Sequence, residues 1–279
     1  MPLVTRFAPS PTGYLHLGHA FSALTAWGRA REGSGHFLLR LEDIDPARCR
    51  PGFATAILDD LAWLGLDWDG EVRVQSRHLA EYRAALDTLT GRGLLYPCFC
   101  TRADIAQSAS APHTPDGAPL YPGTCRRLSV DEREARIAAG ERYALRLDMA
   151  RALTCCGGGL SFEEEGEGRI RCHPERFGDV VLARKDAPAS YHLCVTHDDA
   201  LQGVTLITRG EDLKPATVLH RLLQALLGWP TPTYAHHRLL TDAAGRRLAK
   251  RDRAATLREL RGQGHSPAAV RAMALRTSG

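Results

Sequence analysis

The sequence predicts an α/β fold built on a parallel sheet, because short apolar strands alternate with helical segments from the first residues onward. Leu3–Phe7 is an apolar run of strand length that ends in a cluster of turn-forming residues, Pro9–Gly13. A helix is expected from His19. His36–Leu41 then predicts a second strand, and Ala54–Leu64 a second helix. The order strand, turn, helix, strand, helix is typical of parallel sheets covered by helices.

The middle of the chain differs in composition from both ends. From Cys98 to about Arg176 it is rich in Gly, Pro, Cys and charged residues, and its predicted strands are short, such as Tyr143–Leu147. We therefore expect three segments: the first half of the α/β domain over 1–97, an insertion over 98–177, and the second half of that domain over 178–279. In the last segment, regular structure is predicted at Gly178–Ala183, Val204–Thr208 and Thr217–Leu227, with a helix start at Ser266-Pro267.

The bulk composition is that of a globular protein without a membrane span. The chain has 279 residues, of which 44% are hydrophobic and 24% charged, and no run of about 18 uncharged apolar residues occurs. Met1–Pro11 contains Arg6 and lacks a signal-like apolar run. We expect a cytoplasmic protein and no membrane partner, so the eight cysteines are interpreted as reduced thiols or metal ligands.

Positive charge is concentrated near the end of the chain. Arg246–Arg261 holds seven basic residues and two acidic ones, a local excess of seven minus two, or +5, against +4 for the whole chain. Such a segment is a candidate phosphate-binding surface. A solvated helix face is the alternative, and charge alone does not separate the two.

Two histidines flank a glycine where the first helix is expected to begin. The N-terminus of a helix presents unpaired N–H groups and partial positive charge, which suits the phosphates of ATP. His16 and His19 can donate hydrogen bonds to charge that grows on the phosphates during attack at the α-phosphorus. Gly18 lets a nucleotide approach the backbone, because it has no side chain. The alternative is that both histidines only complete a turn.

A lysine in the basic segment complements this pattern. Lys250 lies 231 residues beyond His19, within Arg247–Arg251. Its ammonium group is a suitable counter-charge for a pyrophosphate leaving group.

Together, these two motifs resemble the two signatures of the class I aminoacyl-tRNA synthetases. Three further stretches, Arg40–Asp45, Asp198–Val204 and Arg209–Leu213, resemble the glutamyl branch of that family. The resemblance covers roughly 1–105 and 177–255. It implies a Rossmann-type parallel sheet as the core, with a small zinc-bearing insertion.

The resemblance also implies a substrate site for ATP, accompanied by Mg²⁺, and for L-glutamate. Catalytic roles fall on His16, His19 and Lys250, which also bind ATP together with Gly18. The positions that hold the amino acid in the family carry Arg6, Ser10, Glu42, Tyr191 and Arg209. This set suits glutamate, because two guanidinium groups can meet two carboxylates and a carboxylate can receive the α-ammonium group. A structural ion pair of Glu42 with an arginine is the alternative.

Three cysteines in the insertion form a candidate metal site. Cys98, Cys100 and Cys125 offer three soft ligands, whereas structural zinc takes four. The shortened glutamyl relatives carry a zinc held by three Cys and one Tyr at this place, which implies Tyr121 as the fourth ligand. His113 competes for that position. Other possibilities are a separate cluster or reduced core thiols; the cluster would use Cys155, Cys156 and Cys172.

Two departures from the family pattern bear on function. Arg247 and Ala249 stand where the loop signature usually has Lys and Ser, although Lys250 is kept. The chain continues for 29 residues after Lys250 (279 minus 250), too few for the anticodon-binding domain of a glutamyl-tRNA synthetase. This combination resembles shortened relatives without that domain. It implies formation of glutamyl-adenylate without tRNA and transfer of glutamate to queuosine in the anticodon loop of tRNA(Asp). We expect a monomer.

Three other functions are compatible with parts of this pattern. A shortened synthetase could still charge the 3′ end of a tRNA. A small-molecule nucleotidyltransferase could use the same His-x-Gly-His helix, although the Arg209–Leu213 and Asp198–Val204 stretches disfavour it. A non-catalytic RNA-binding paralogue is expected to have lost His16, His19 or Lys250, and all three are present.

Overall fold

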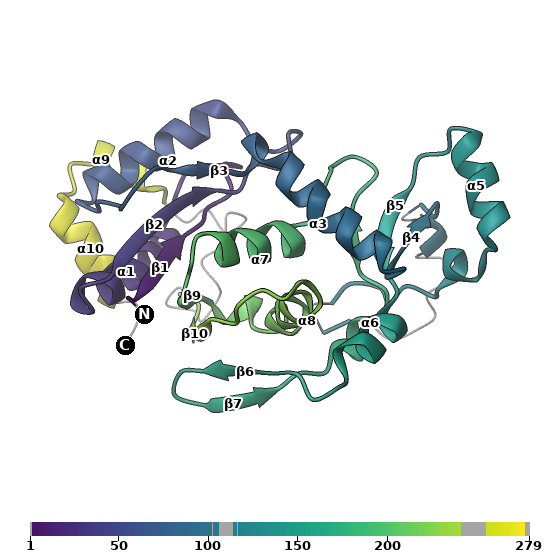
Figure 1. Cartoon of the computed structure of the whole chain (residues 1–279). Coiled ribbons are helices and arrows are strands. Elements are labelled where there is room, and N and C mark those ends of the chain that lie inside the picture. The colour runs from purple at the N-terminus through teal and green to yellow at the C-terminus, as the bar shows by residue number, and fades with distance from the viewer. Residues whose placement is uncertain (1, 102, 106–113, 116, 241–254, 277–279) are drawn as a thin grey trace.

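Two sheets containing parallel strands form the centre of the fold. The structure, a computed structural model, describes residues 2–101, 103–105, 114–115, 117–240 and 255–276. In the first sheet, β1 (Val4–Phe7), β2 (His36–Leu41) and β3 (Arg73–Val74) are parallel, in the order β1-β2-β3. In the second, β9 (Leu206–Gly210) and β10 (Thr233–His237) are parallel (Figure 1). The predicted α/β class with a parallel sheet is confirmed.

The two sheets meet along β1 and β9. The backbone N–H of Thr205 donates to the carbonyl oxygen of Val4 over 3.0 Å. Two residues further along β1, Arg6 Nη1 donates to the carbonyl oxygen of Thr208 over 3.3 Å. Since both contacts advance in the same direction, β1 and β9 run parallel and their carboxyl ends lie together. In open α/β sheets, ligands bind at such a junction.

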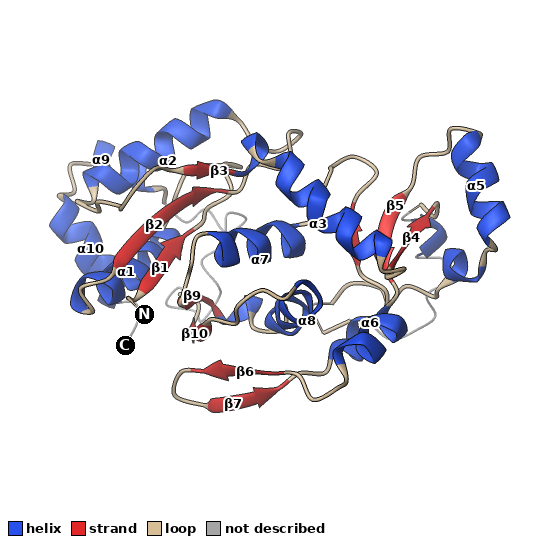
Figure 2. Cartoon of the chain, viewed as in Figure 1, coloured by secondary structure: helices blue, strands red, loops and turns tan. Residues whose placement is uncertain are grey.

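Helices flank the strands of both sheets (Figure 2). Around the first sheet lie α1 (Leu17–Glu32), α2 (Pro51–Trp63), α9 (Leu257–Gly262) and α10 (Pro267–Arg276), which bury one apolar cluster with it. Around the second lie α3 (Leu79–Gly91), α7 (Tyr191–Leu201) and α8 (Thr217–Leu227), which bury another. Short 3-10 turns link these elements at Gln75–Arg77, Thr124–Arg127, Pro174–Phe177 and Glu211–Leu213. Within the described parts of the chain, no helix combines the length and the apolarity that a membrane span requires.

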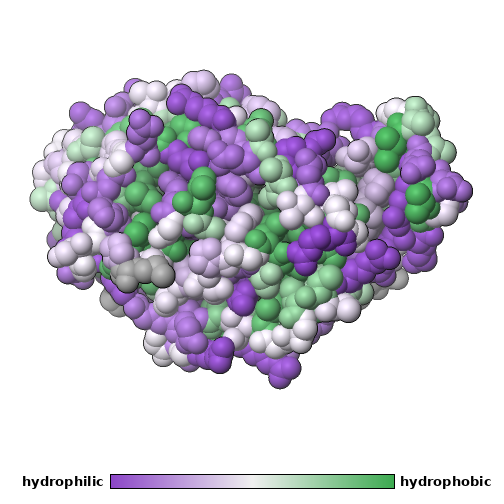
Figure 3. All heavy atoms as spheres, viewed as in Figure 1, coloured by the Kyte–Doolittle hydropathy of each residue, from purple (hydrophilic) through white to green (hydrophobic). Residues whose placement is uncertain are grey.

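Most of the middle of the chain forms a smaller lobe, separated from the main body by a notch in Figure 3. Its antiparallel sheet consists of β4 (Leu95–Cys98), β5 (Ala144–Leu147) and β8 (Val181–Ala183), with α5 (Val130–Ala138) beside it. The chain leaves this sheet after Leu147 and returns to it at Val181.

Another part of the middle segment returns to the main body. Helix α6 (Met149–Cys156) packs into the cluster with α8. The hairpin of β6 (Ser161–Glu164) and β7 (Gly168–Arg171) extends the second sheet, because β6 pairs in parallel with β10 at Glu164 and Tyr234.

Observed element ends depart from the predicted ones where caps decide them. Strand β2 and helix α8 have the predicted bounds. Helix α1 begins at Leu17 and not at His19, because the side chain of His16 caps it. The strand predicted at Val204–Thr208 is shifted to β9, because the Val204 N–H still bonds to the end of α7, at the carbonyl oxygen of Asp199 (2.9 Å).

Candidate active site

A cavity of about 470 Å³ opens where the carboxyl ends of β1 and β9 meet. The described residues that the sequence predicted for glutamate and ATP all line it: Arg6, Ser10, His16, Gly18, His19, Glu42, Tyr191 and Arg209. They come from β1, the turn after it, the start of α1, the end of β2, α7 and β9. Residues as far apart in the chain as Arg6 and Arg209 thus share one cavity.

Lys250, with its neighbours Arg247 and Ala249, lies outside the described residues. The described residues that come before and after positions 241–254 lie at the cavity or next to it. Leu240 lines the cavity. On the other side, Thr256 forms a β-bridge with His16, and the Leu257 N–H donates to the carbonyl oxygen of Leu15 (2.8 Å).

The two histidines form the cap of helix α1. His16 Nδ1 accepts a hydrogen bond from the Gly18 backbone N–H (3.1 Å), and His19 Nδ1 accepts one from the His16 backbone N–H (3.2 Å). The rings lie 3.8 Å apart between centroids. Because each Nδ1 is an acceptor, each neutral ring carries its proton on Nε2. The cap thereby fixes the tautomer in which Nε2 can donate to an anion at the helix N-terminus.

A buried network of charges lies under the cavity. Asp199 Oδ1 accepts hydrogen bonds from Arg6 Nε (2.9 Å) and from Arg40 Nη2 (2.8 Å), and Arg40 Nη2 lies 3.4 Å from Glu42 Oε1. All four side chains are buried, Arg40 completely. Burial raises the pKa of Asp199, but the charges of Arg6 and Arg40 outweigh it and the net pKa is lowered. At Glu42 burial prevails over the same two arginines and raises the pKa to about 7.

The neighbouring Asp198 anchors the second layer of this network. Its carboxylate accepts hydrogen bonds from Gln75 Nε2 (2.9 Å) and Tyr82 Oη (2.8 Å) and lies 2.9 Å from Arg73 Nε. It is completely buried and also lies close to His197 and Glu81, in a grouping that could suggest a metal site. An arginine already neutralises this carboxylate, so we interpret the grouping as structural.

Arg209 is held from three sides. Its guanidinium donates to Thr217 Oγ1 (2.6 Å), to His220 Nδ1 (3.1 Å) and to His236 Nε2 (3.1 Å). The side chain is 5% exposed and borders the cavity.

The supporting residues of both arginines, Arg6 and Arg209, were not predicted from the sequence. A signal existed for some of them. Arg40 lies on β2 and Glu42 directly follows that strand, two residues on, and Asp198-Asp199 is an acidic pair on a helix that has no other acidic residue. For His220 and His236 the sequence gives no such signal, because neither stands in a recognisable motif.

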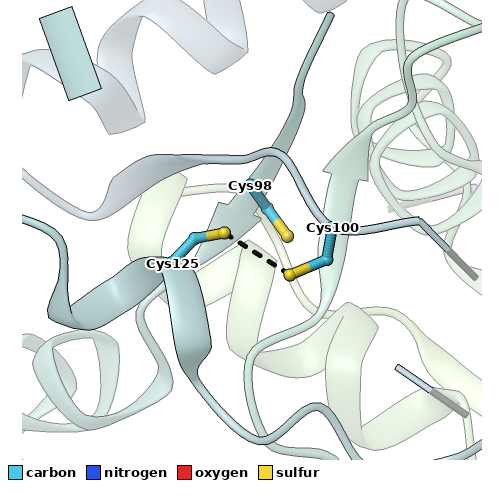
Figure 4. A group of neighbouring side chains, drawn as sticks. All are labelled: Cys98, Cys100 and Cys125. Carbon is cyan, nitrogen blue, oxygen red and sulfur yellow. Dashed lines mark hydrogen bonds between the residues drawn. The ribbon is translucent and has the colours of Figure 1, made fainter. Parts of the chain in front are cut away.

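The three cysteines of the insertion converge, as Figure 4 shows. The sulfur atoms of Cys98, Cys100 and Cys125 lie within 4.8 Å of one another, and Cys100 and Cys125 are 3.5 Å apart. Tyr121 Oη is 3.6 Å from Cys100 Sγ and accepts the Cys125 backbone N–H over 2.8 Å. Around a tetrahedral zinc with Zn–S bonds of about 2.3 Å, sulfur atoms are roughly 3.8 Å apart. These three thiols and one phenol therefore fit a structural zinc ion.

The competing metal ligands are not brought together in the same way. Across the described ranges, Cys155, Cys156 and Cys172 do not form a group with metal-ligand spacing. Cys155 is exposed and Cys172 is buried, and burial raises the pKa of the Cys172 thiol to about 11. His113 lies outside the described residues.

Comparison with known proteins assigns this fold and site to a family. Residues 2–278 match the family described as tRNA synthetases class I (E and Q), catalytic domain. The chain belongs to this family. It is a ligase of the aminoacyl-tRNA synthetase type, which confirms the predicted enzyme class.

Several curated relatives are similar over most of the chain. A glutamyl-Q tRNA(Asp) synthetase of Rhodobacter capsulatus is 52% identical, over 96% of this chain and 98% of the relative. One of Symbiobacterium thermophilum is 46% identical, over 96% and 84%. A glutamate–tRNA ligase of Aquifex aeolicus is 37% identical, over 95% of this chain and 55% of the ligase.

A solved structure has a similar fold. The crystal structure of a glutamate tRNA ligase from Elizabethkingia meningosepticum, in complex with its amino acid, is 27% identical with a TM-score of 0.76. The similarity covers 90% of this chain and 52% of that one.

The network around Asp199 predicts a large effect on stability. Asp199→Asn leaves the buried Arg6 and Arg40 with a neutral partner in place of a carboxylate. Breaking a buried pair in this way typically lowers the free energy of unfolding by about 3–5 kcal/mol, which urea denaturation would measure. The control is Asp87→Asn in the exposed Arg83–Asp87 pair, with an expected loss of about 0–1 kcal/mol. Equal losses for both variants would contradict the role given to Asp199.

Proposed function

We propose that the protein activates L-glutamate with ATP and transfers the glutamyl group to queuosine in the anticodon loop of tRNA(Asp). The observation that carries the proposal is the cavity at the β1–β9 junction. One cavity joins a capped helix N-terminus, suited to phosphates, with two buried arginines suited to carboxylates. Relatives named glutamyl-Q tRNA(Asp) synthetase support the choice of substrate and acceptor.

In the first step, the carboxylate of glutamate attacks the α-phosphorus of ATP, giving glutamyl-adenylate and pyrophosphate. The partial positive charge at the start of α1 and the Nε2–H groups of His16 and His19 stabilise charge on the phosphates. Lys250 neutralises the leaving pyrophosphate. This role is supported by Leu240, which lines the cavity, and by Thr256, which pairs with the cavity residue His16. Mg²⁺ accompanies the ATP.

Glutamate binds beside the phosphates. Arg6 and Arg209 meet its two carboxylates, Glu42 receives the α-ammonium group, and Tyr191 and Ser10 complete the pocket. The residues mainly hold the reacting groups in place, because adenylate formation requires alignment and charge stabilisation. Activation needs no tRNA in this proposal.

The second step moves the glutamyl group to a tRNA acceptor. The near-complete mutual coverage with the Rhodobacter capsulatus relative favours queuosine. The similarity to the Aquifex aeolicus ligase favours the other candidate, charging of a tRNA 3′ end.

We also propose that Cys98, Cys100, Cys125 and Tyr121 hold one zinc ion. The spacing of the three thiols and the nearby phenol support it. Bound there, zinc would cross-link the segments around β4 and Thr124–Arg127 in a lobe whose own apolar cluster is small.

The acceptor can be tested with trimmed tRNA. Removal of the 3′-terminal adenosine from queuosine-containing tRNA(Asp) should leave glutamate acceptance intact, because the proposed acceptor lies in the anticodon loop. Acceptance of labelled glutamate would be measured with intact and trimmed tRNA(Asp), and with tRNA(Asp) lacking queuosine. Loss of acceptance on trimming, with acceptance kept without queuosine, would favour charging of the 3′ end.

Glutamate binding should depend on pH through Glu42. Its pKa is raised to about 7 by burial, and only the carboxylate form attracts an ammonium group. The KM for glutamate should therefore fall as pH rises from 6 to 8, by up to about tenfold per pH unit below the pKa. ATP–pyrophosphate exchange would measure it, with the KM for ATP as the control. Glu42→Gln should raise the KM and flatten its pH dependence; an unchanged slope in this variant would remove Glu42 from the ammonium site.

Purified protein should contain zinc at about one ion per chain. Cys125→Ser should lower this content strongly, because a thiolate ligand is lost, whereas Cys155→Ser, at an exposed cysteine, should not. Elemental analysis by mass spectrometry would measure the content. Metal-free protein of unchanged melting temperature would refute the zinc proposal.

A further inference from the structure

The contacts of Arg209 leave a defined part of its guanidinium for a ligand. The group carries five N–H donors. Nε donates to His236, one Nη1–H to His220 and one Nη2–H to Thr217. Within the described part of the chain, these three contacts leave one N–H on each terminal nitrogen, at a side chain that borders the cavity. Two such donors suit the two oxygens of a carboxylate.

His236 on β10, which accepts a hydrogen bond from Arg209, is itself oriented by the buried carboxylate of Glu164. Because His236 Nε2 accepts from Arg209, the neutral ring carries its proton on Nδ1. Nδ1 donates to Glu164 Oε2 over 2.7 Å, and the His236 backbone N–H donates to Glu164 Oε1 over 2.8 Å. Both carboxylate oxygens of Glu164 thus bind the same residue. Glu164 is 3% exposed, so this arrangement is shielded from water.

His220, the other histidine that contacts Arg209, is also oriented by a hydrogen bond to a second side chain. His220 Nδ1 accepts from Arg209, so its Nε2 carries the proton and donates to His192 Nδ1 over 3.2 Å. Burial, together with the charge of Arg209, lowers the pKa of His236 to about 4 and that of His220 well below its usual value. Both rings therefore stay neutral near pH 7 and serve as acceptors for the arginine.

These contacts connect the hairpin to the cavity. Glu164 ends β6, which pairs with β7 on one side and with β10, at Tyr234, on the other. Its carboxylate acts through the ring of His236 on an arginine of β9, the next strand. Removal of Glu164 would leave His236 free to rotate or to change tautomer, and Nε2 could then become a donor facing Arg209.

We infer that Glu164 and His236 are positioning residues for Arg209, which hold its two remaining N–H groups toward a carboxylate of the substrate. This inference rests on the proposed function, because it takes glutamate as the ligand of the cavity. The competing explanation is that Glu164 only fastens the hairpin to the sheet, in which case glutamate and ATP binding would change together or not at all.

The test compares Glu164→Ala and Glu164→Gln with Glu165→Gln, a control at the neighbouring exposed carboxylate that pairs with Arg29. Glutamate binding is measured by isothermal titration calorimetry, and the KM for ATP by pyrophosphate exchange. Glu164→Ala should weaken glutamate binding by about ten- to hundredfold, since misplacing a binding group by about 1 Å has effects of this size. The KM for ATP should stay within about twofold, and the control should bind like the parent.

Glu164→Gln keeps the size of the side chain and provides a second variant for the test if the alanine variant does not fold. Its amide offers one acceptor oxygen where the carboxylate offers two, so glutamate binding should fall by an intermediate factor. Folded Glu164→Gln that binds glutamate like the parent would overturn the inference. So would equal losses for glutamate and ATP.

Arg209→Lys separates this inference from the proposed function. If Arg209→Lys binds glutamate like the parent, Arg209 is not in a glutamate pocket and that part of the proposed function fails. If Arg209→Lys loses binding while both Glu164 variants keep it, only the positioning inference fails. In the double variant Glu164→Ala with Arg209→Lys, the Glu164 change should add little, because the group that it positions is already lost.

Discussion

The buried carboxylate of Asp199 is the interaction on which the cavity depends. It joins Arg6 on β1 to Arg40 on β2, at the point where the first sheet meets β9. Unpaired charges in such a dry site would be costly, so the two arginines are tolerated because Asp199 and Glu42 balance them. The balance is uneven. Asp199 is held as an anion, whereas burial brings the pKa of Glu42 to about 7. A ligand that brings an ammonium group would favour the carboxylate form of Glu42.

The start of α1, the part of the cavity proposed to bind the phosphates, is not built on a buried ion pair. There, the residues that stabilise the helix are those proposed to act on ATP. His16 and His19 cap α1 through their Nδ1 atoms, and this assigns the proton to the opposite nitrogen of each ring. The start of the helix, its cap and its donors toward an anion are thus one local structure. Thr256, which lies within the basic segment, forms a β-bridge with His16 at the same place.

The middle of the chain serves both parts of the molecule. Its cysteine cluster belongs to the smaller lobe, while its hairpin joins the second sheet and brings Glu164 to His236 and, through it, to Arg209. A segment that composition marks as an insertion therefore supplies a buried carboxylate next to the proposed glutamate pocket. The two arginines of this pocket are supported in different ways, Arg6 by an anion and Arg209 by neutral histidines.

The sequence by itself determined the α/β class, strand β2 and helix α8, because these depend on local periodicity. Its motifs and the family that they resemble also predicted eight of the residues that line the cavity, because motif spacing survives without a structure. It also predicted the three cysteines that converge. Only the tertiary structure decided which buried polar or charged side chain pairs with which. Asp199, Glu164, His220 and His236 reach their partners across strands and helices far apart in the chain, and such pairings depend on packing, which leaves no periodic trace in a single sequence. Cap geometry decided the start of α1 for the same reason, since a histidine cap is recognised by the atoms it binds and not by its residue type.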